Sequence, residues 1–142
     1  MSKINLTTFK EAIDNILKIR NVRGLLLFTY TPYIGCDKSI LLIDEERNIV
    51  IDRFIKIKKK YPIKISNTFP GLRALKRNDR KRPIWSSIVI NQGKITNCCC
   101  REGIYDANTC HYCGCTPAIE TYMLEQLKPL AIIDYLKFLL GG

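Results

Sequence analysis

Six of the seven cysteines in this chain lie between Cys98 and Cys115. Thiols this close together constrain the fold strongly, because they must bond to one another, bind a shared metal or be buried together. The first residues carry no apolar signal-peptide core, and no apolar run approaches the length of a membrane helix. We therefore expect a cytoplasmic protein in a reducing compartment. Clustered thiols there more often bind a metal than form disulfides.

The candidate metal ligands form a triplet and a knuckle that are separated by nine residues. They are Cys98, Cys99, Cys100, Cys110, Cys113 and Cys115. Four cysteine ligands suit Zn²⁺ or a 4Fe–4S iron–sulfur cluster, and the spacing does not choose between these cofactors. Reduced, buried structural cysteines are the alternative, but six in so short a segment favour a metal centre.

The C-x-x-C pair of Cys110 and Cys113 is the best-placed part of this set, because its two thiolates can converge on one metal across a tight turn. Gly114 follows and could supply the positive φ that such a turn often needs. In an extended strand Cys99 would point away from its two neighbours, so we expect one or two ligands from the triplet, with Cys115 in reserve. We expect His111 to point away from the metal.

The pattern of apolar residues predicts an α/β fold class, a partial-barrel-like βαβ unit followed by a β-hairpin, the cysteine knuckle and C-terminal helices. Val22 to Tyr30 is apolar on both faces, which is typical of a buried parallel strand. A helix is expected from Asp44 to Pro62, and Ile63 to Asn67 alternates like a second strand. Ser87 to Asn97 is typical of a hairpin because Asn-Gln-Gly separates two apolar runs.

Further helices are expected at both ends of the chain. Thr8 can cap an N-terminal helix that buries Phe9 and Ile13, and Thr116 can cap a C-terminal one with Pro117 in its first position. The length predicts a single domain over 1–142. Its parts would be an α/β portion over 1–83, a hairpin and metal segment over 84–117, and C-terminal helices over 118–142.

The order of these motifs resembles the C-terminal half of radical S-adenosylmethionine proteins whose tail carries an auxiliary metal cluster. The shared features are a strand ending TPY-x-G, the helix DEERNIVIDRFIKIKKKYP, the strand IKISN, Trp85, the hairpin INQGKITNCC and the knuckle C-x-x-C-G-C. The resemblance runs from Val22 to Leu127. It implies an iron–sulfur cofactor held by the cysteines.

Two departures limit what this resemblance implies. The C-x-x-x-C-x-x-C loop that holds the radical-generating cluster is absent, and Trp85 is followed by Ser86 where relatives often have a cysteine. The chain alone is therefore not expected to be a radical enzyme, and no residue is assigned a catalytic role. S-adenosylmethionine would be a cofactor only if a partner subunit supplied the N-terminal half. Otherwise the chain would be a remnant that retains the metal-binding tail.

The basic residues, like the cysteines, are concentrated in one part of the sequence. The whole chain has a net charge of +10, but residues 53–82 contain twelve basic residues and one acidic residue, a net of +11. Such a stretch favours binding of nucleic acid or a phosphate-bearing substrate. The candidate residues are Lys58, Lys59, Lys60, Arg73, Lys76, Arg77, Arg80, Lys81 and Arg82. A solvated helix end followed by a basic loop explains the same pattern without a partner.

Three functions follow from these patterns. The first is a metal-binding domain, with zinc or iron–sulfur, that acts with a partner or as a remnant. The second is a small zinc-knuckle protein that binds nucleic acid through residues 53–82. A third is a structural metal site in an interaction protein without catalysis. No phosphate-binding loop, dinucleotide-binding loop or metalloprotease spacing is present in the sequence to suggest a competing catalytic site.

Overall fold

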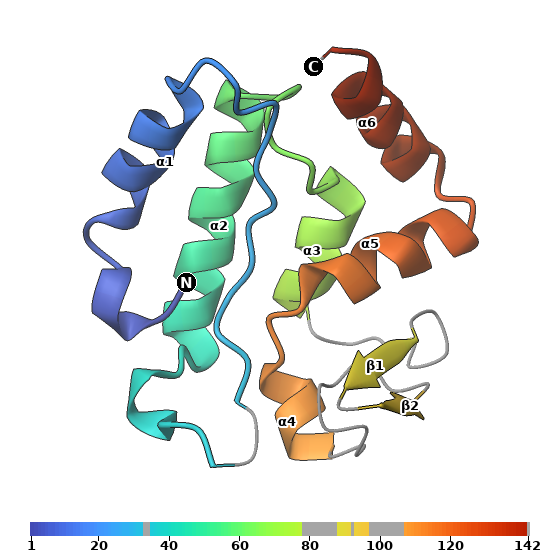
Figure 1. The fold of residues 1–142 in the computed structure, drawn as a ribbon. Coiled ribbons are helices and arrows are strands. Elements are labelled where there is room, and N and C mark those ends of the chain that lie inside the picture. The colour runs from blue at the N-terminus through green and yellow to red at the C-terminus, as the bar shows by residue number, and fades with distance from the viewer. Residues whose placement is uncertain (33–34, 78–87, 92, 97–106, 142) are drawn as a thin grey trace.

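The computed structural model describes residues 1–32, 35–77, 88–91, 93–96 and 107–141. These residues are largely helical, and the predicted α/β class is wrong (Figure 1). The α-helices are α1 (Phe9–Leu17), α2 (Asp44–Lys60), α3 (Phe69–Arg77), α4 (Ala107–Tyr112), α5 (Thr116–Glu125) and α6 (Pro129–Leu140). Two 3-10 turns, η1 (Lys3–Asn5) and η2 (Lys38–Ile40), accompany them, and β1 (Val89–Asn91) pairs antiparallel with β2 (Lys94–Thr96).

The expected βαβ unit is reduced to a single parallel bridge between Leu25 and Ile65. The backbone N–H of Leu25 donates to the carbonyl of Lys64, and the N–H of Ser66 donates to the carbonyl of Leu25, at 2.8 and 2.9 Å. Neither run extends into a strand of a sheet, because the second one turns into α3 only a few residues later. Residues 24–31 instead cross the molecule as an extended segment, which runs alongside α2 in Figure 1.

Beyond the bridge, the side chain of Asn67 takes over the hydrogen bonding to the extended segment. The amide of Asn67 accepts from the N–H of Leu27 at 2.7 Å and donates to the carbonyl of Leu27 at 2.9 Å. An asparagine amide carries the same donor and acceptor as a peptide group, so it can stand in for the missing strand residue. Asn67 is fully buried, so this pair satisfies backbone groups that water cannot reach.

Helix α2 lies between two apolar clusters. Val50, Phe54 and Ile57 face α1, where Phe9 meets Phe54 edge to face at 6.1 Å between ring centroids. Ile51 belongs to the second cluster, which α2 shares with α3, α5 and α6. A helix that buries more than one face must be central to the fold. Figure 1 shows this arrangement, with α1 on one side of α2 and α3, α5 and α6 on the other.

Carboxylates from two C-terminal helices hold the start of α3. Glu120 of α5 accepts from the backbone N–H and the hydroxyl of Thr68, at 3.1 and 2.6 Å. Asp134 of α6 accepts from the N–H of Phe69 at 2.8 Å. Carboxylates are favourable there because the first N–H groups of a helix have no partner within the helix. Burial raises the pKa of Glu120 to about 7, although the bonds from Thr68 oppose this shift.

The first residues of the helices agree only in part with those expected from the sequence. Thr8 is the N-cap of α1 but makes no side-chain capping bond. Asp44 is the first residue of α2, after the N-cap Ile43, and has a φ of 42°. Cys115, not Thr116, is the N-cap of α5, and the hydroxyl of Thr116 donates to the carbonyl of Leu27 at 3.0 Å. No helix in the described part of the chain combines the length and apolar character needed to cross a membrane.

Candidate metal centre

The two cysteines of the C-x-x-C pair lie together in the interior. Cys110 lies in the last turn of α4, and Cys113 is the first residue after this helix. Their exposed fractions are 6% and 2%. The backbone N–H of Cys113 donates to the carbonyl of Cys110 at 3.3 Å, which closes a tight turn between them. Cys115 is half-buried at the N-terminus of α5. These three residues thus lie in the short stretch between the end of α4 and the start of α5.

Polar groups surround the sulfur of Cys113. The backbone N–H of Cys115 donates to Sγ of Cys113 at 3.3 Å. The hydroxyl of Thr31 lies 3.8 Å from the same sulfur, and it also accepts from the N–H of Gly114 at 3.3 Å. Because Thr31 already accepts from Gly114, its own proton can be directed at Cys113. Donors of this kind stabilise the negative charge of a thiolate ligand and tune the metal it binds.

Gly114 is required by close packing and not by an unusual φ. Gly35 and Gly93 have positive φ angles, whereas Gly114 does not. A Cβ at Gly114 would overlap the backbone carbonyl of Thr29, in the extended segment. The predicted reason for a glycine here is therefore wrong, but the glycine is needed. Its absence of a side chain lets the knuckle lie directly on residues 24–31, so that Thr31 reaches Cys113.

Only part of the expected ligand set lies within the described residues. Cys98, Cys99 and Cys100 lie outside them, and so does Trp85. Among the residues that the structure describes, no group of three or more His, Cys, Asp or Glu side chains is close enough together to hold a metal ion. The described part of the candidate centre is thus the knuckle of Cys110, Cys113 and Cys115 with its support from Thr31.

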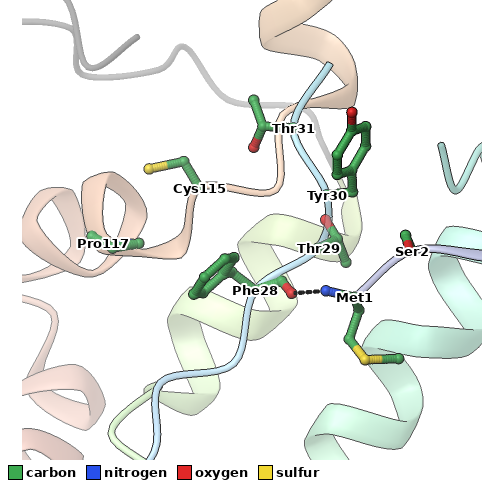
Figure 2. A pocket seen from close by; sticks show the side chains of 8 residues that line it. All are labelled: Met1, Ser2, Phe28, Thr29, Tyr30, Thr31, Cys115 and Pro117. Carbon is green, nitrogen blue, oxygen red and sulfur yellow. Dashed lines mark hydrogen bonds between the residues drawn. The ribbon is translucent and has the colours of Figure 1, made fainter. Parts of the chain in front are cut away.

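A cavity of about 330 Å³ opens next to the knuckle (Figure 2). Cys115 and Pro117 form one wall, and Phe28, Thr29 and Tyr30 of the extended segment form another. The hydroxyl oxygen of Thr29 is buried and has no hydrogen-bond partner among the described residues. The volume is at the lower end of the range for small-molecule pockets, roughly 300 to 1000 Å³. A small molecule could therefore approach Cys115 from this side.

His111 and Cys36 are less buried than Cys110 and Cys113. His111 is exposed, and its ring packs edge to face on Tyr112 at 4.7 Å between centroids. Cys36 is half-buried beyond the extended segment. Its hydrogen bond with Tyr30 raises the pKa of that phenol, with smaller effects from burial and from the charges of Cys36 and Asp37.

One of the basic residues of the second hypothesis lies inside the protein. Lys58 is fully buried, and its ammonium donates to the carbonyls of Pro62 and Ile65, each at 2.7 Å. Burial lowers the pKa of Lys58, while the charges of Asp134 and Glu120 oppose this change. Lys58 is therefore a structural cation that no external phosphate can reach. Its place in a run of three lysines had suggested an exposed position.

The other basic candidates are spread over two helices. Lys60 pairs with Asp14 at 3.2 Å, and Lys76 donates to both carboxylate oxygens of Asp52 at 2.8 and 2.7 Å. Lys59, Arg73 and Arg77 are exposed. Arg80, Lys81 and Arg82 lie outside the described residues.

Sequence reasoning missed Thr31 and Asn67, the two polar residues that tie the knuckle and α3 to the extended segment. Thr31 precedes a proline in what reads as a loop, and nothing in its neighbourhood marks it as a partner of a cysteine 82 positions away. Comparison of the chain with protein-family models, with curated proteins and with solved structures found no match.

Proposed function

We propose that this protein binds a metal centre through cysteine thiolates, with Cys110 and Cys113 as two of the ligands. The observation that carries the proposal is the environment of Cys113. Cys110 and Cys113 are both buried, the N–H of Cys115 donates to the sulfur of Cys113, and the hydroxyl of Thr31 lies within hydrogen-bond distance of that sulfur. A purely apolar site would suffice for a structural thiol, whereas oriented donors are what a negatively charged ligand needs.

The remaining ligands would come from the triplet of Cys98 to Cys100, with Cys115 as the alternative. Cys115 is the N-cap of α5, where the positive end of the helix dipole favours a thiolate. A cysteine-only set fits both Zn²⁺ and a 4Fe–4S cluster, since each takes four thiolates. The cavity beside Cys115 favours a centre that a small molecule can approach over one that is fully enclosed.

Anaerobic purification followed by analysis of zinc, iron and acid-labile sulfide tests the proposal. We expect one cysteine-bound centre per chain. Iron with stoichiometric sulfide and a broad visible absorption would identify a cluster, and one equivalent of zinc without visible colour would identify a zinc knuckle. Protein that contains neither metal and takes up neither on reconstitution under reducing conditions would refute the proposal.

A further inference from the structure

A second candidate site lies between α1 and α2. A groove of about 340 Å³ opens there, which we call the α1–α2 groove. Leu6, Phe9 and Ile57 provide its apolar surface. Its other lining residues are polar or charged: Thr7, Lys10, Arg53, Lys56 and Lys60. Four cations thus surround one apolar hollow, and no carboxylate of the described residues lines it.

The cations converge because of helix geometry. Arg53, Lys56 and Lys60 are separated by three and four residues, so they project from one face of α2. Lys10 faces them from α1. Arg53 is held in place, since its Nη1 donates to the carbonyl of Leu6 at 3.1 Å and its guanidinium lies 5.9 Å from the centre of the Phe9 ring.

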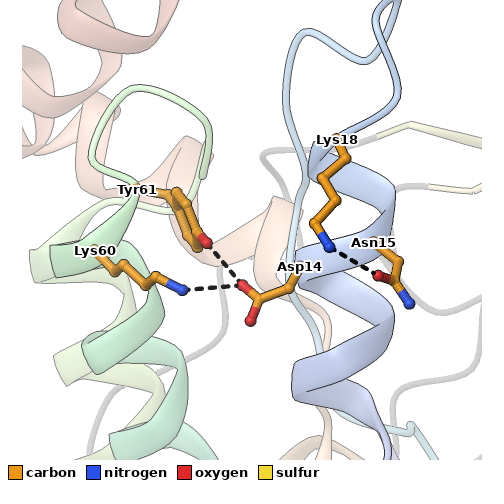
Figure 3. A network of polar contacts seen from close by, with 5 residues as sticks. All are labelled: Asp14, Asn15, Lys18, Lys60 and Tyr61. Atoms are coloured by element: carbon orange, nitrogen blue, oxygen red, sulfur yellow. Dashed lines mark hydrogen bonds and ion pairs between the residues drawn. The ribbon is translucent and has the colours of Figure 1, made fainter.

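The nearest carboxylate does not neutralise this charge. Asp14 accepts from the hydroxyl of Tyr61 at 2.7 Å and from Lys60 at 3.2 Å, and these contacts join α1 to the end of α2 (Figure 3). The hydrogen bonds from Tyr61 and then Lys60 lower the pKa of Asp14, so it is ionised and already engaged at neutral pH. Asp14 pairs with Lys60 alone, and among the described residues Lys10, Arg53 and Lys56 form no ion pair.

We propose that the α1–α2 groove binds a small phosphorylated molecule with an apolar or aromatic body, of about the size of a mononucleotide. Arginine and lysine together suit the several oxygens of a phosphate or diphosphate group. Leu6 and Phe9 give the rest of the ligand an apolar surface to cover. The volume suits a compact ligand better than a polynucleotide, which needs a track of cations along the surface. Among the described residues of the basic stretch, neither Lys58 nor Lys76 extends the groove in this way, because Lys58 is internal and Lys76 binds Asp52.

The test is a titration of the whole chain with a fluorescent methylanthraniloyl derivative of ADP, followed by competition with unlabelled ADP, inorganic phosphate and oligothymidylate. The groove variant is Lys10→Gln with Lys56→Gln. The matched control is Lys18→Gln with Lys59→Gln, which removes the same charge from the same two helices at exposed positions outside the groove. The urea midpoint of each variant checks that all three proteins are equally folded.

We expect saturable binding that ADP displaces, a loss of about tenfold or more in the groove variant, and a change under about twofold in the control. Equal weakening in both variants would mean diffuse attraction to a basic protein and would overturn the proposal. So would the absence of saturable binding, or displacement by oligothymidylate but not by ADP. None of these outcomes bears on the cysteines, so this site and the metal centre can fail separately.

Discussion

Lys58 shows how a basic residue in a run of lysines can have an entirely internal role. Its ammonium bonds to two carbonyls of the turn that follows α2, and Glu120 and Asp134 supply negative charge nearby. Both carbonyls belong to the turn beyond the helix, and the buried lysine gives each of them a hydrogen-bond donor. Sequence reasoning placed Lys58 with the solvated lysines because the run itself carries no sign of which member turns inward.

Replacing Lys58 by methionine should lower the free energy of unfolding by about 3 kcal/mol, because the side chain still fills the space but both carbonyls lose their donor. Lys59→Met, at the next and exposed position, is the control and should change stability by less than about 0.5 kcal/mol. Urea unfolding at neutral pH measures both. If the two variants were equally stable, the internal role of Lys58 would be wrong.

Glu120 makes a prediction about pH. Its pKa is about 7 in the folded protein against 4.5 in an unfolded chain, so the folded state binds the extra proton between these values. Stability from this group is therefore present below about pH 4.5 and is lost as the pH rises through 7, by roughly 3 kcal/mol at most. Other carboxylates titrate in the opposite sense, so only a comparison of variants isolates Glu120.

The comparison is Glu120→Gln, with Glu125→Gln on the exposed side of the same helix as its control. A glutamine can accept from the N–H of Thr68 and donate to its hydroxyl, so the contacts are kept while the titration is removed. Urea midpoints from about pH 4.5 to 7.5 should show the Glu120 variant gaining stability relative to the original chain as the pH rises. A constant difference across this range, as expected for the control, would contradict the raised pKa.

At the scale of elements, the extended segment of residues 24–31 joins the parts of the fold. It pairs briefly with Ile65, then with the side chain of Asn67, and finally contacts Thr116 and Gly114 at the knuckle. The hydrophobicity of this segment predicted burial in a sheet. Instead Leu27 and Thr29 point inward while Leu26 and Phe28 are 38% and 53% exposed. An extended segment can bury one face without neighbouring strands. The pattern of apolar residues alone therefore could not distinguish a strand in a sheet from the isolated extended segment.

Asn67→Asp is the sharpest test of this arrangement. The change is nearly isosteric, but it replaces a donor by a carboxylate oxygen that would face the carbonyl of Leu27 inside the protein. We expect a loss of about 3 kcal/mol in the free energy of unfolding at neutral pH. Asn15→Asp on the exposed face of α1 is the control and should cost less than about 0.5 kcal/mol. Similar urea midpoints for both variants would show that Asn67 does not hold the segment.

Local signals gave the helices with fair accuracy but not their arrangement. Pro62 and Pro129 mark the end of α2 and the beginning of α6, and the spacing of Val50, Phe54 and Ile57 identifies the buried face of α2. These features depend on neighbours in sequence. The contacts that decide the fold class, such as Asn67 with Leu27 at a separation of 40 residues, leave no local pattern.

At the scale of the whole molecule, the cysteines and the basic residues belong to different regions. The knuckle contacts Thr29 and Thr31 of the extended segment, whereas the α1–α2 groove is lined by residues 6–10 and by residues of α2. The resemblance to radical S-adenosylmethionine proteins relied on the strand–helix–strand order as well as on the cysteines. The strand–helix–strand order is not present in the structure. Metal binding therefore stays a prediction that depends on the knuckle alone.

The metal content of two single variants tests this central prediction most directly. Cys113→Ser replaces the sulfur that accepts from Cys115 and Thr31, and Cys36→Ser is a matched change of a cysteine outside the knuckle. Metal per chain, measured after anaerobic purification, should be lost or strongly reduced in the first variant and unchanged in the second. Full metal content in Cys113→Ser, or equal loss in both variants, would contradict a centre at the knuckle.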